Sequence, residues 1–347
     1  MKLNGMKIGI KHKPFIIAEI SANHNNDIST VFKLLEAAKE CNVDAVKVQT
    51  YTADSLTIKS DRPEFKINNE KSLWHGRTLY ELYSEGSMPY DWYPAIFEFA
   101  KNLELTLFSS PFDEHAVDFL ENFKVQAYKV ASPEIIHLPL IKKIAETKKP
   151  VIMSTGMASL EEIIQATNEI RKKNIKDFAL LQCISSYPAN PYNFNLRNIE
   201  LLRQIFNCEV GLSDHSLGNG VACAAVALGA TIIEKHFILH RDDGGLDAKF
   251  SLEPKEMKSL VNETLNAWQA SQGVNLGPSP DEQISMMYRR SIYVTSDLKS
   301  GDYIKKDHLK IIRPSNGLKP INFNKILGRK VKTDILAGTP LTFDLIK

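Results

Sequence analysis

The chain has 347 residues, of which 43% are hydrophobic and 24% charged, and its formal net charge at pH 7 is +2. That length accommodates one large domain and a small one, and the composition is typical of a globular protein. A net charge so close to zero gives no indication of a nucleic acid partner or of an acidic membrane surface. Since no run approaches the roughly 18 apolar residues needed to span a bilayer, we expect no membrane segment.

The four cysteines, Cys41, Cys183, Cys208 and Cys223, are scattered without Cys-x-x-Cys spacing. This spacing argues against a disulfide framework and against a structural zinc knuckle. We expect reduced thiols, most of them buried, in a cytoplasmic protein. The amino terminus has no uninterrupted apolar segment before a small-residue cleavage site, so no signal peptide is expected.

From residue 15 to about residue 270, short apolar runs alternate with amphipathic stretches, a pattern typical of a parallel sheet with crossover helices. The runs that we interpret as strands cover 15–20, 44–49, 105–110, 126–131, 150–155, 178–184, 209–214 and 231–236. The stretches that we interpret as helices cover 29–42, 94–104, 114–123, 138–147, 160–173, 196–206 and 219–229. Eight strand–helix units in about 260 residues favour a (β/α)8 TIM barrel. The alternative is an open doubly wound sheet, which usually has fewer strands and often a glycine-rich first turn that this chain lacks.

Residues 50–93 separate the second predicted strand from its helix and carry three aromatic clusters. A loop beyond about 15 residues inside a compact domain is usually functional, and this one is long enough to fold over the barrel mouth. Residues 273–288 begin with GVNLGPSPDEQ, which has two prolines and two glycines and is typical of a linker. We therefore predict a barrel domain over 1–272 and a small β-rich domain over 289–347, with short runs separated by turns such as LKSGD and ILAGTP.

The active site of a TIM barrel lies at the carboxyl ends of its strands, so polar residues that end different strands should converge. Because side chains alternate along a strand, Lys47 and Gln49 share one face, while Val46 and Val48 pack on the other. A lysine in an apolar strand costs desolvation free energy unless its ammonium group pairs with an anion. Lys47 and Lys129, with a ring of serine and threonine hydroxyls, therefore predict a phosphate or carboxylate site.

Each of these residues also has an ordinary interpretation. A lysine near a strand end is often a surface side chain that extends its ammonium group to water. Serine and threonine at strand ends often cap the next helix, and we assign that role to Ser159, which has capping-box spacing with Glu162. The joint pattern favours a site, since seven of the eight predicted strands end in polar groups.

His215 and His236 each lie where an apolar run gives way to polar residues. Two imidazoles at strand ends can hold a divalent metal between them. A Mn²⁺ or Mg²⁺ site needs about six ligands, so water and a substrate oxygen would have to supply most of the others. Such an open site suits Lewis-acid chemistry. A structural zinc site is disfavoured, because no third and fourth Cys or His ligand lies nearby in the sequence.

Several motifs resemble the sialic acid synthase family. They are AEISANHNND, DAVKVQTY, SSPFD, AYKVASPEI, STGMAS, YPA, GLSDHS, EKHF and LDAKFSLEP, in that order from about residue 14. IIRPSNGL and KVKTDILAGTPLT resemble the carboxyl-terminal antifreeze-like (SAF) domain of that family. QTYTADSLT followed by LYELYSEGSMPYDW resembles the pseudaminic acid branch more than the N-acetylneuraminate or legionaminate branches.

The resemblance implies that phosphoenolpyruvate condenses with an amino-sugar aldehyde, in this branch 2,4-diacetamido-2,4,6-trideoxy-L-altrose, with release of phosphate. It implies a divalent cation held by His215 and His236, Mn²⁺ first and Mg²⁺ or Co²⁺ as alternatives, and a domain-swapped homodimer. Phosphoenolpyruvate would contact Lys47, Ser110, Lys129, Ser132, Ser154 and Ser213. Proton transfer and the stabilisation of developing positive charge would be the roles of Glu19, Glu134 and Glu234. The sugar would contact Gln49, Tyr187, Asp247 and, from the small domain of a partner subunit, Arg313.

Three alternatives stay open at this point. The same chemistry can act on N-acetylmannosamine or on the legionaminic acid precursor. A carbohydrate-binding protein that uses its SAF-like domain would not need the barrel residues. An aldolase would work through a Schiff base on Lys129.

Overall fold

The computed structural model describes residues 1–70 and 72–347, so residue 71, within the long interval 50–93, lies outside the described residues. The chain divides into two compact units, Met1–Gln272 and Gly273–Lys347. Among residues 1–70 and 72–347, none of the helices has both the length and the apolar character that a membrane span requires. All four cysteines are free among the described residues, but Cys208 and Cys223 are only half-buried, so the expectation that most are buried holds for Cys41 and Cys183 alone.

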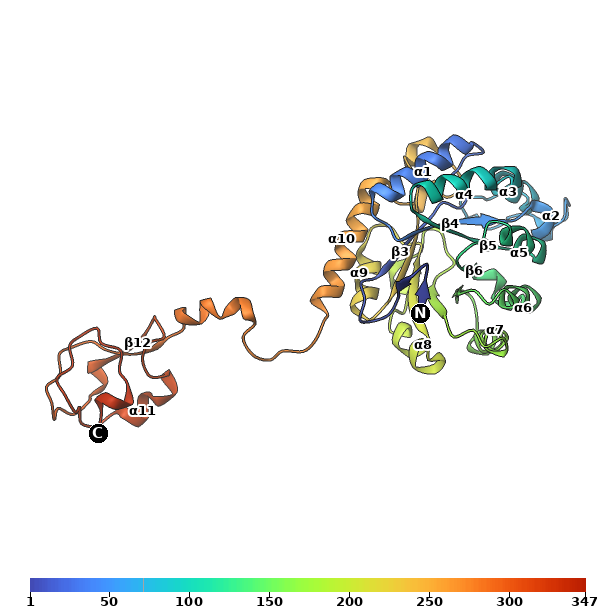
Figure 1. The fold of residues 1–347 in the computed structure, drawn as a ribbon. Coiled ribbons are helices and arrows are strands. Elements are labelled where there is room, and N and C mark those ends of the chain that lie inside the picture. Colours follow the sequence, from blue (N-terminus) through green and yellow to red (C-terminus); the bar gives the residue numbers. More distant parts are fainter. Residues whose placement is uncertain (71) are drawn as a thin grey trace. The chain divides into compact units, whose positions relative to one another are not determined.

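The larger unit is a closed barrel, and its described residues contain eight parallel strands in the order β10-β3-β4-β5-β6-β7-β8-β9 (Figure 1). The strands are β3 Phe15–Glu19, β4 Ala45–Thr50, β5 Thr106–Pro111, β6 Tyr128–Val130, β7 Val151–Ser154, β8 Phe178–Cys183, β9 Glu209–Asp214 and β10 Ile232–His236. Each coincides with a predicted strand to within two residues. Because β3 pairs with both β4 and β10, the sheet has no free edge, which confirms the barrel and excludes the open sheet.

Helices form a ring around the strands (Figure 1). They are α1 Ile28–Glu40, α4 Tyr93–Asn102, α5 Glu114–Glu121, α6 Leu138–Glu146, α7 Leu160–Lys172, α8 Asn198–Phe206, α9 Gly220–Ala227 and α10 Pro254–Ala270. The interval 50–93 contains α2 Ala53–Leu56 and α3 Leu79–Gly86. The seven predicted helices are present, whereas α10 was not predicted. Its start carries a capping box between Glu253 and Glu256 and a proline at the first helical position, which are sequence signals for a helix.

The alternation of side chains along each strand decides what fills the barrel. Outward residues such as Val46 and Val48 join the core between strands and helices. Inward residues such as Ile17 and Phe108 fill the amino-terminal half of the barrel interior. A short hairpin of β1 Lys2–Leu3 and β2 Met6–Lys7, which was not predicted, adds Leu3 to this inner cluster and so closes that end. Inward positions nearest the carboxyl end are polar instead, among them Glu19 and Lys47.

An ion pair is buried on the outer face of β9 and β10. Lys235 Nζ donates to Asp214 Oδ2 at 2.6 Å and to the Ser216 carbonyl oxygen at 2.7 Å, and both charged side chains are fully buried. Asp214 Oδ1 accepts from the backbone N–H and the hydroxyl of Ser216. Each charge is therefore compensated within the protein.

Lys235→Met is expected to lower the free energy of unfolding by about 3–5 kcal/mol, because it leaves the Asp214 carboxylate buried without its cation. Urea unfolding at pH 7 measures this loss. The double variant Lys235→Met/Asp214→Leu is the control, and it should recover most of the loss because no charge remains buried. A single variant as stable as the wild type would contradict this role of the pair.

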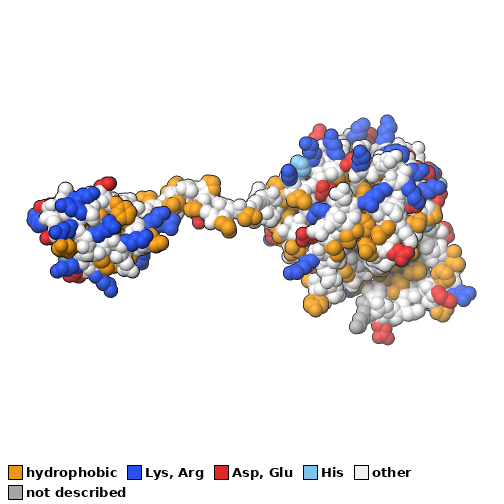
Figure 2. Space-filling model, turned by 90° about the horizontal axis from the view of Figure 1, so that it is seen from below, with side chains coloured by type: hydrophobic (Ala, Val, Ile, Leu, Met, Phe, Trp, Pro, Cys, Tyr) orange, Lys and Arg blue, Asp and Glu red, His pale blue; other side chains and the backbone are white. Residues whose placement is uncertain are grey.

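The smaller unit contains β11 Ser291–Val294 paired antiparallel with β12 Leu309–Ile312, and the single-turn helix α11 Phe323–Ile326. The predicted β-rich character is weaker than expected, because turn segments interrupt the ladders and much of the remaining pairing consists of isolated bridges such as Leu298↔Ile335. A separate apolar core holds this unit together. Lys and Arg side chains spread over the face that Figure 2 shows, consistent with thirteen Lys and Arg against seven Asp and Glu in residues 273–347.

Candidate active site

Each barrel strand places one buried, inward-facing side chain in a layer at the carboxyl end of the barrel, which we call the polar layer. In strand order along the chain, its members among the described residues are Glu19, Lys47, Ser110, Lys129, Ser154, Cys183, Ser213 and Glu234. Seven of them were predicted as site residues. Cys183 was missed, although its position two residues after the inward-facing Leu181 indicates it.

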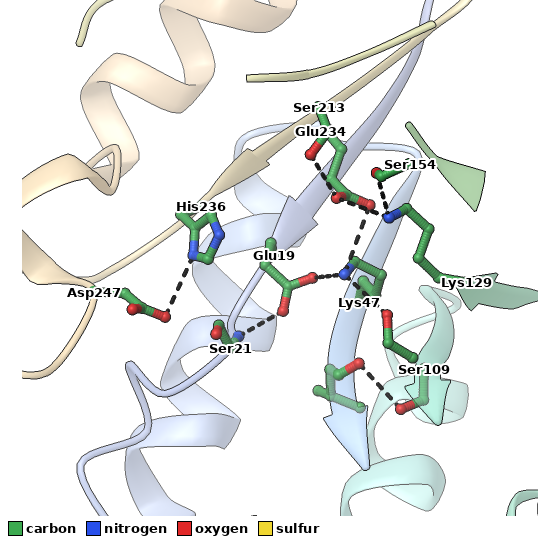
Figure 3. Close-up of polar contacts among 12 residues, drawn as sticks. Glu19, Ser21, Lys47, Ser109, Lys129, Ser154, Ser213, Glu234, His236 and Asp247 are labelled. Carbon is green, nitrogen blue, oxygen red and sulfur yellow. Dashed lines mark hydrogen bonds and ion pairs between the residues drawn. The ribbon is translucent and has the colours of Figure 1, made fainter. Parts of the chain in front are cut away.

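Two lysines and two glutamates form the charged centre of the polar layer (Figure 3). Lys47 forms an ion pair with Glu19, and its Nζ lies 3.7 Å from Glu234 Oε2. Lys129 Nζ lies 3.6 Å from Glu234 Oε1. Glu19 is held in place by the backbone N–H of Ser21, which donates to its Oε1 at 2.8 Å. All four charges are buried, so each depends on the others for compensation.

Serine hydroxyls surround this centre. Lys129 Nζ donates to Ser154 Oγ at 2.6 Å, and Lys47 Nζ donates to Ser110 Oγ at 3.2 Å. The Ser213 hydroxyl donates to Glu234 Oε1 at 3.0 Å. Ser154 is thus a partner of a lysine. The two ammonium groups and the serine hydroxyls together offer several donors to a small anion.

The carboxyl groups of the centre differ in acidity. Burial raises the pKa of Glu19 to about 7, and the neighbouring Lys47 only partly opposes this. For Glu234, burial acts in the same direction, but Lys129 and Lys47 outweigh it and hold the pKa below its ordinary value. Glu234 therefore stays ionised near neutral pH, while Glu19 can exchange a proton there. Neighbouring carboxyl groups whose pKa values are pushed apart are typical of acid–base sites.

Glu134 lies just after β6, in the short 3-10 segment Pro133–Ile136, at the edge of the same region. Its Oε2 is buried, and no described residue forms a hydrogen bond with it. Burial raises the pKa of Glu134 to about 7. This carboxyl group is thus a second candidate for proton exchange near neutral pH.

The raised pKa of Glu134 predicts a pH-dependent stability difference between the wild type and Glu134→Gln. The contribution of a protonated Glu134 is fully present below the unfolded-state pKa of about 4.5 and is lost as the pH rises through about 7, because only the folded state holds the proton in that window. The wild type should therefore lose about 3 kcal/mol relative to the variant between pH 4.5 and 8. Urea unfolding of both proteins across this range measures the difference, and a constant difference would contradict the assignment.

His215 and His236 follow β9 and end β10, and their ring centroids are 5.3 Å apart. His215 Nδ1 lies 2.9 Å from the carbonyl oxygen of Ile184, so this nitrogen carries a proton. Burial lowers the pKa of the His215 ring, but the contacts of Nδ1 with Cys183 and with the Ile184 carbonyl oxygen outweigh it and raise the pKa above its ordinary value. Cys183 Sγ is also near that nitrogen, but at 3.9 Å it is the weaker contact. His236 Nδ1 lies 3.5 Å from Asp247 Oδ2, at ion-pair distance but without hydrogen-bond geometry (Figure 3).

Burial and the nearby His215 and Lys47 hold the pKa of His236 well below its usual range. This ring is therefore neutral at physiological pH, as a metal ligand must be. In the described part of the chain, no group of three or more His, Cys, Asp or Glu side chains is arranged to hold a metal ion. The two histidines could thus supply part of a coordination shell that stays open to other ligands.

A cavity of about 280 Å³ opens above the polar layer. Its lining includes the predicted sugar-contacting residues Gln49, Tyr187 and Asp247, together with Glu134 and His236. The Tyr187 ring packs on His215 with centroids 4.5 Å apart. The predicted sugar contacts of the barrel are therefore brought together at its mouth.

The interval 50–93 covers part of this mouth, as expected from its length. Leu56, Trp74, Leu82 and Tyr83 line the cavity, and the indole N–H of Trp74 donates to the Leu246 carbonyl oxygen at 3.0 Å. The sequence indicated the interval but not which of its side chains face the cavity.

Three further residues with predicted roles, Ser132, Ser159 and Arg313, lie in different parts of the structure. The Ser132 hydroxyl accepts from the backbone N–H of Gly156 at 3.1 Å, which places it beside the loop that follows Ser154. Ser159 caps α7 with the predicted capping box to Glu162. Arg313 is an exposed residue of the smaller unit, and its contact with a partner's site stays a prediction.

Residues 34–275 match the model of the NeuB family, which is more than half of the chain. The chain belongs to the NeuB family. Residues 289–347 match the SAF domain, so the resemblance to sialic acid synthases with a carboxyl-terminal SAF domain is confirmed. Every predicted site residue of this NeuB-family protein except Glu19 lies within one of the two matched regions.

Similar proteins agree with this membership. The NeuB-family chain is 41% identical over 329 residues to the pseudaminic acid synthase of Campylobacter jejuni, a match that covers 95% of each protein. It is 38% identical to the pseudaminic acid synthase of Helicobacter pylori, over 96% of this chain and 98% of that protein. A crystal structure of N-acetylneuraminic acid synthetase from Leptospira borgpetersenii in complex with citrate superposes with a TM-score of 0.73 at 31% identity, over 83% of this chain and 95% of that one.

Proposed function

We propose that this protein is a pseudaminic acid synthase, which condenses phosphoenolpyruvate with 2,4-diacetamido-2,4,6-trideoxy-L-altrose and water to give pseudaminic acid and phosphate. The observation that carries the proposal is the polar layer, in which two buried lysines and several hydroxyls meet two glutamates. The cavity above this layer is lined by His236 and Tyr187, among others. The names of the relatives that match over nearly the whole chain supply the branch of the family.

Phosphoenolpyruvate carries a carboxylate and a phosphate, and both need cations and hydroxyl donors in a buried site. Lys47 and Lys129 supply the charge. Ser110, Ser132, Ser154 and Ser213 supply further donors at the same end of the barrel. The ligand would replace Glu19 and Glu234 as partner of the lysines, and Glu19, with a pKa of about 7, can accept a proton as it gives up Lys47.

The reaction joins C3 of phosphoenolpyruvate to the aldehyde carbon of the open-chain sugar. The aldehyde oxygen gains the electron pair of its C=O bond and a proton, and positive charge develops on C2. Water adds to C2 and gives up one proton. The resulting hydroxyl then loses its second proton to the departing phosphate as the bond between C2 and the phosphate oxygen breaks, which leaves a keto group. Glu19 and Glu134 exchange the protons, and the ionised Glu234 stabilises the positive charge on C2.

A divalent cation, Mn²⁺ in the first place with Mg²⁺ or Co²⁺ as alternatives, would bind to His215 and His236. Nδ1 of His215 donates to the Ile184 carbonyl oxygen, which leaves Nε2 as the ligand atom once the ring is deprotonated, and the lowered pKa of His236 keeps that ring neutral. When bound, the ion polarises the carbonyl group of the sugar. Tyr187, Gln49 and Asp247 orient the sugar from the walls of the cavity.

The assembly that we propose is a domain-swapped homodimer in the cytoplasm, in which Arg313 of one subunit reaches the sugar in the other. The charges of the two units support this, because residues 273–347 carry a formal excess of six positive charges and residues 1–272 a formal excess of four negative charges. An arginine fork is also well suited to the oxygen atoms of an anionic product.

Phosphate release tests the proposed function. Purified full-length protein is incubated with phosphoenolpyruvate, Mn²⁺ and one of three sugars: the diacetamido-trideoxy-altrose, N-acetylmannosamine or the legionaminic acid precursor. We expect the first sugar to be turned over fastest. Turnover of N-acetylmannosamine alone would contradict the assignment to the pseudaminic acid branch. A lack of turnover with all three sugars would favour a carbohydrate-binding protein.

A further inference from the structure

Large apolar side chains line part of the cavity, and we call them the apolar wall. The wall consists of Leu56, Trp74, Leu82, Phe112 and Leu246. Three of its five members come from the interval 50–93, whereas the polar residues of the cavity come mainly from the strand ends and the loops that follow them. The cavity therefore combines a polar floor with an apolar wall.

Contacts between residues far apart in the sequence hold the wall together. Trp74 is tied to Leu246 through the hydrogen bond to its carbonyl oxygen. The Tyr51 ring packs edge-on against Phe112 at 5.1 Å and against Tyr83 at 6.2 Å. Helix α2, which ends at Leu56, packs against α3. These contacts hold the wall and its surroundings in place.

Gly86 shows how closely α3 is seated on the barrel mouth. A Cβ atom at this position would lie 2.8 Å from Tyr51 Oη and 3.2 Å from Leu246 Cδ1. The carbonyl oxygen of Gly86 also lies 3.3 Å from His24 Nε2. Leu82 is four residues earlier, on the same face of the helix, so this seating directs its buried side chain toward the cavity.

We propose that the apolar wall selects a sugar with a methyl group at C6, and that Leu82 is the specificity-determining residue that contacts this methyl group. The proposal rests on the proposed function. The aldehyde carbon has to lie at the polar floor near His236, so the other end of the six-carbon chain points away from it. The Trp74 N–H is already used by Leu246, so among the wall residues no donor remains for a hydroxyl at C6.

A hydroxymethyl group against this wall would lose hydrogen bonds to water that the wall cannot replace. Hydrophobic pockets distinguish such closely related groups by about 10- to 100-fold. The hydroxyl groups of Tyr51 and Tyr83 lie beside the wall, and the edge-on contact with Phe112 holds the Tyr51 ring in place. We therefore expect the wild type to prefer the 6-deoxy sugar by about 10- to 100-fold in kcat/KM.

The test compares 2,4-diacetamido-2,4,6-trideoxy-L-altrose with its counterpart that carries a hydroxyl at C6. Phosphate release gives kcat/KM for each sugar with the full-length wild type, Leu82→Ser and Leu82→Met. The ratio of the two values is the readout, because a variant that is partly unfolded lowers both values equally. Leu201→Ser, which makes the same change at a half-exposed position of α8, is the control.

We expect Leu82→Ser to reduce the preference for the 6-deoxy sugar about tenfold or more, and Leu82→Met, which conserves volume, and Leu201→Ser to keep it. Equal kcat/KM values in the wild type, or an unchanged ratio in Leu82→Ser, would overturn the inference while leaving the proposed function intact. No turnover of either sugar by the wild type would overturn the proposed function and this inference with it.

Discussion

Lys129→Met is expected to lower kcat/KM for phosphoenolpyruvate by about 10³-fold or more. The ammonium group of Lys129 is buried, donates to Ser154 and lies 3.6 Å from Glu234. Its removal takes a cation from the bound anion and leaves the Glu234 carboxylate less compensated in the same site. A loss of about 4 kcal/mol, typical of a buried charge that loses its partner, corresponds to roughly 10³-fold in rate. Steady-state kinetics with phosphoenolpyruvate varied at saturating sugar measures the effect.

Lys235→Met is the matched control for this experiment. It also removes a fully buried ammonium group, but on the outer face of the barrel, where Asp214 and not the cavity is its partner. This variant should be less stable and yet keep the KM for phosphoenolpyruvate. If both variants lost turnover to the same degree, the loss would reflect stability alone. A covalent adduct on Lys129 after treatment with borohydride and substrate would instead indicate a Schiff base.

His236→Ala is expected to weaken Mn²⁺ binding and turnover severely, and His215→Ala should do the same. With two histidines facing the site, either substitution leaves one protein nitrogen for the ion. We expect the affinity for Mn²⁺ to fall at least 100-fold and kcat by about 10³-fold or more. Titration with Mn²⁺ followed by electron paramagnetic resonance measures binding separately from activity.

The exposed His12 offers a control for the histidine variants, because His12→Ala makes the same change outside the barrel mouth. It should bind Mn²⁺ like the wild type. A His236→Ala variant that kept both full metal affinity and full turnover would contradict the proposed metal site and would favour a binding protein that does not use the barrel.

The barrel was predictable because strands buried on both faces read as continuous apolar runs. Against that background an inward lysine or glutamate stands out, which is how Lys47, Lys129 and Glu234 were found. Cys183 occupies an equivalent inward position but was missed, because a thiol does not stand out in an apolar run. The prediction of the polar layer thus depended on the contrast between charge and an apolar strand.

The apolar wall could not be predicted, because it depends on contacts between distant parts of the chain. Position 86 has room only for a glycine, because Tyr51 and Leu246 approach it closely in space. Nothing in the sequence around α3 indicates those neighbours. The hairpin of β1 and β2 was missed for a different reason. Its strands have two residues each, too few for a periodic pattern, and its role depends on packing of Leu3 inside the barrel.

The reaction proposed for the polar layer joins phosphoenolpyruvate to an amino sugar and cleaves the bond between C2 and the phosphate oxygen. The direct test uses phosphoenolpyruvate labelled with heavy oxygen at the bridge between C2 and phosphorus, together with the diacetamido-trideoxy-altrose, Mn²⁺ and the purified protein. Mass spectrometry then locates the label. We predict a nine-carbon keto acid without the label and phosphate that carries it. Label retained in the organic product, or phosphate released without consumption of sugar, would contradict this reaction.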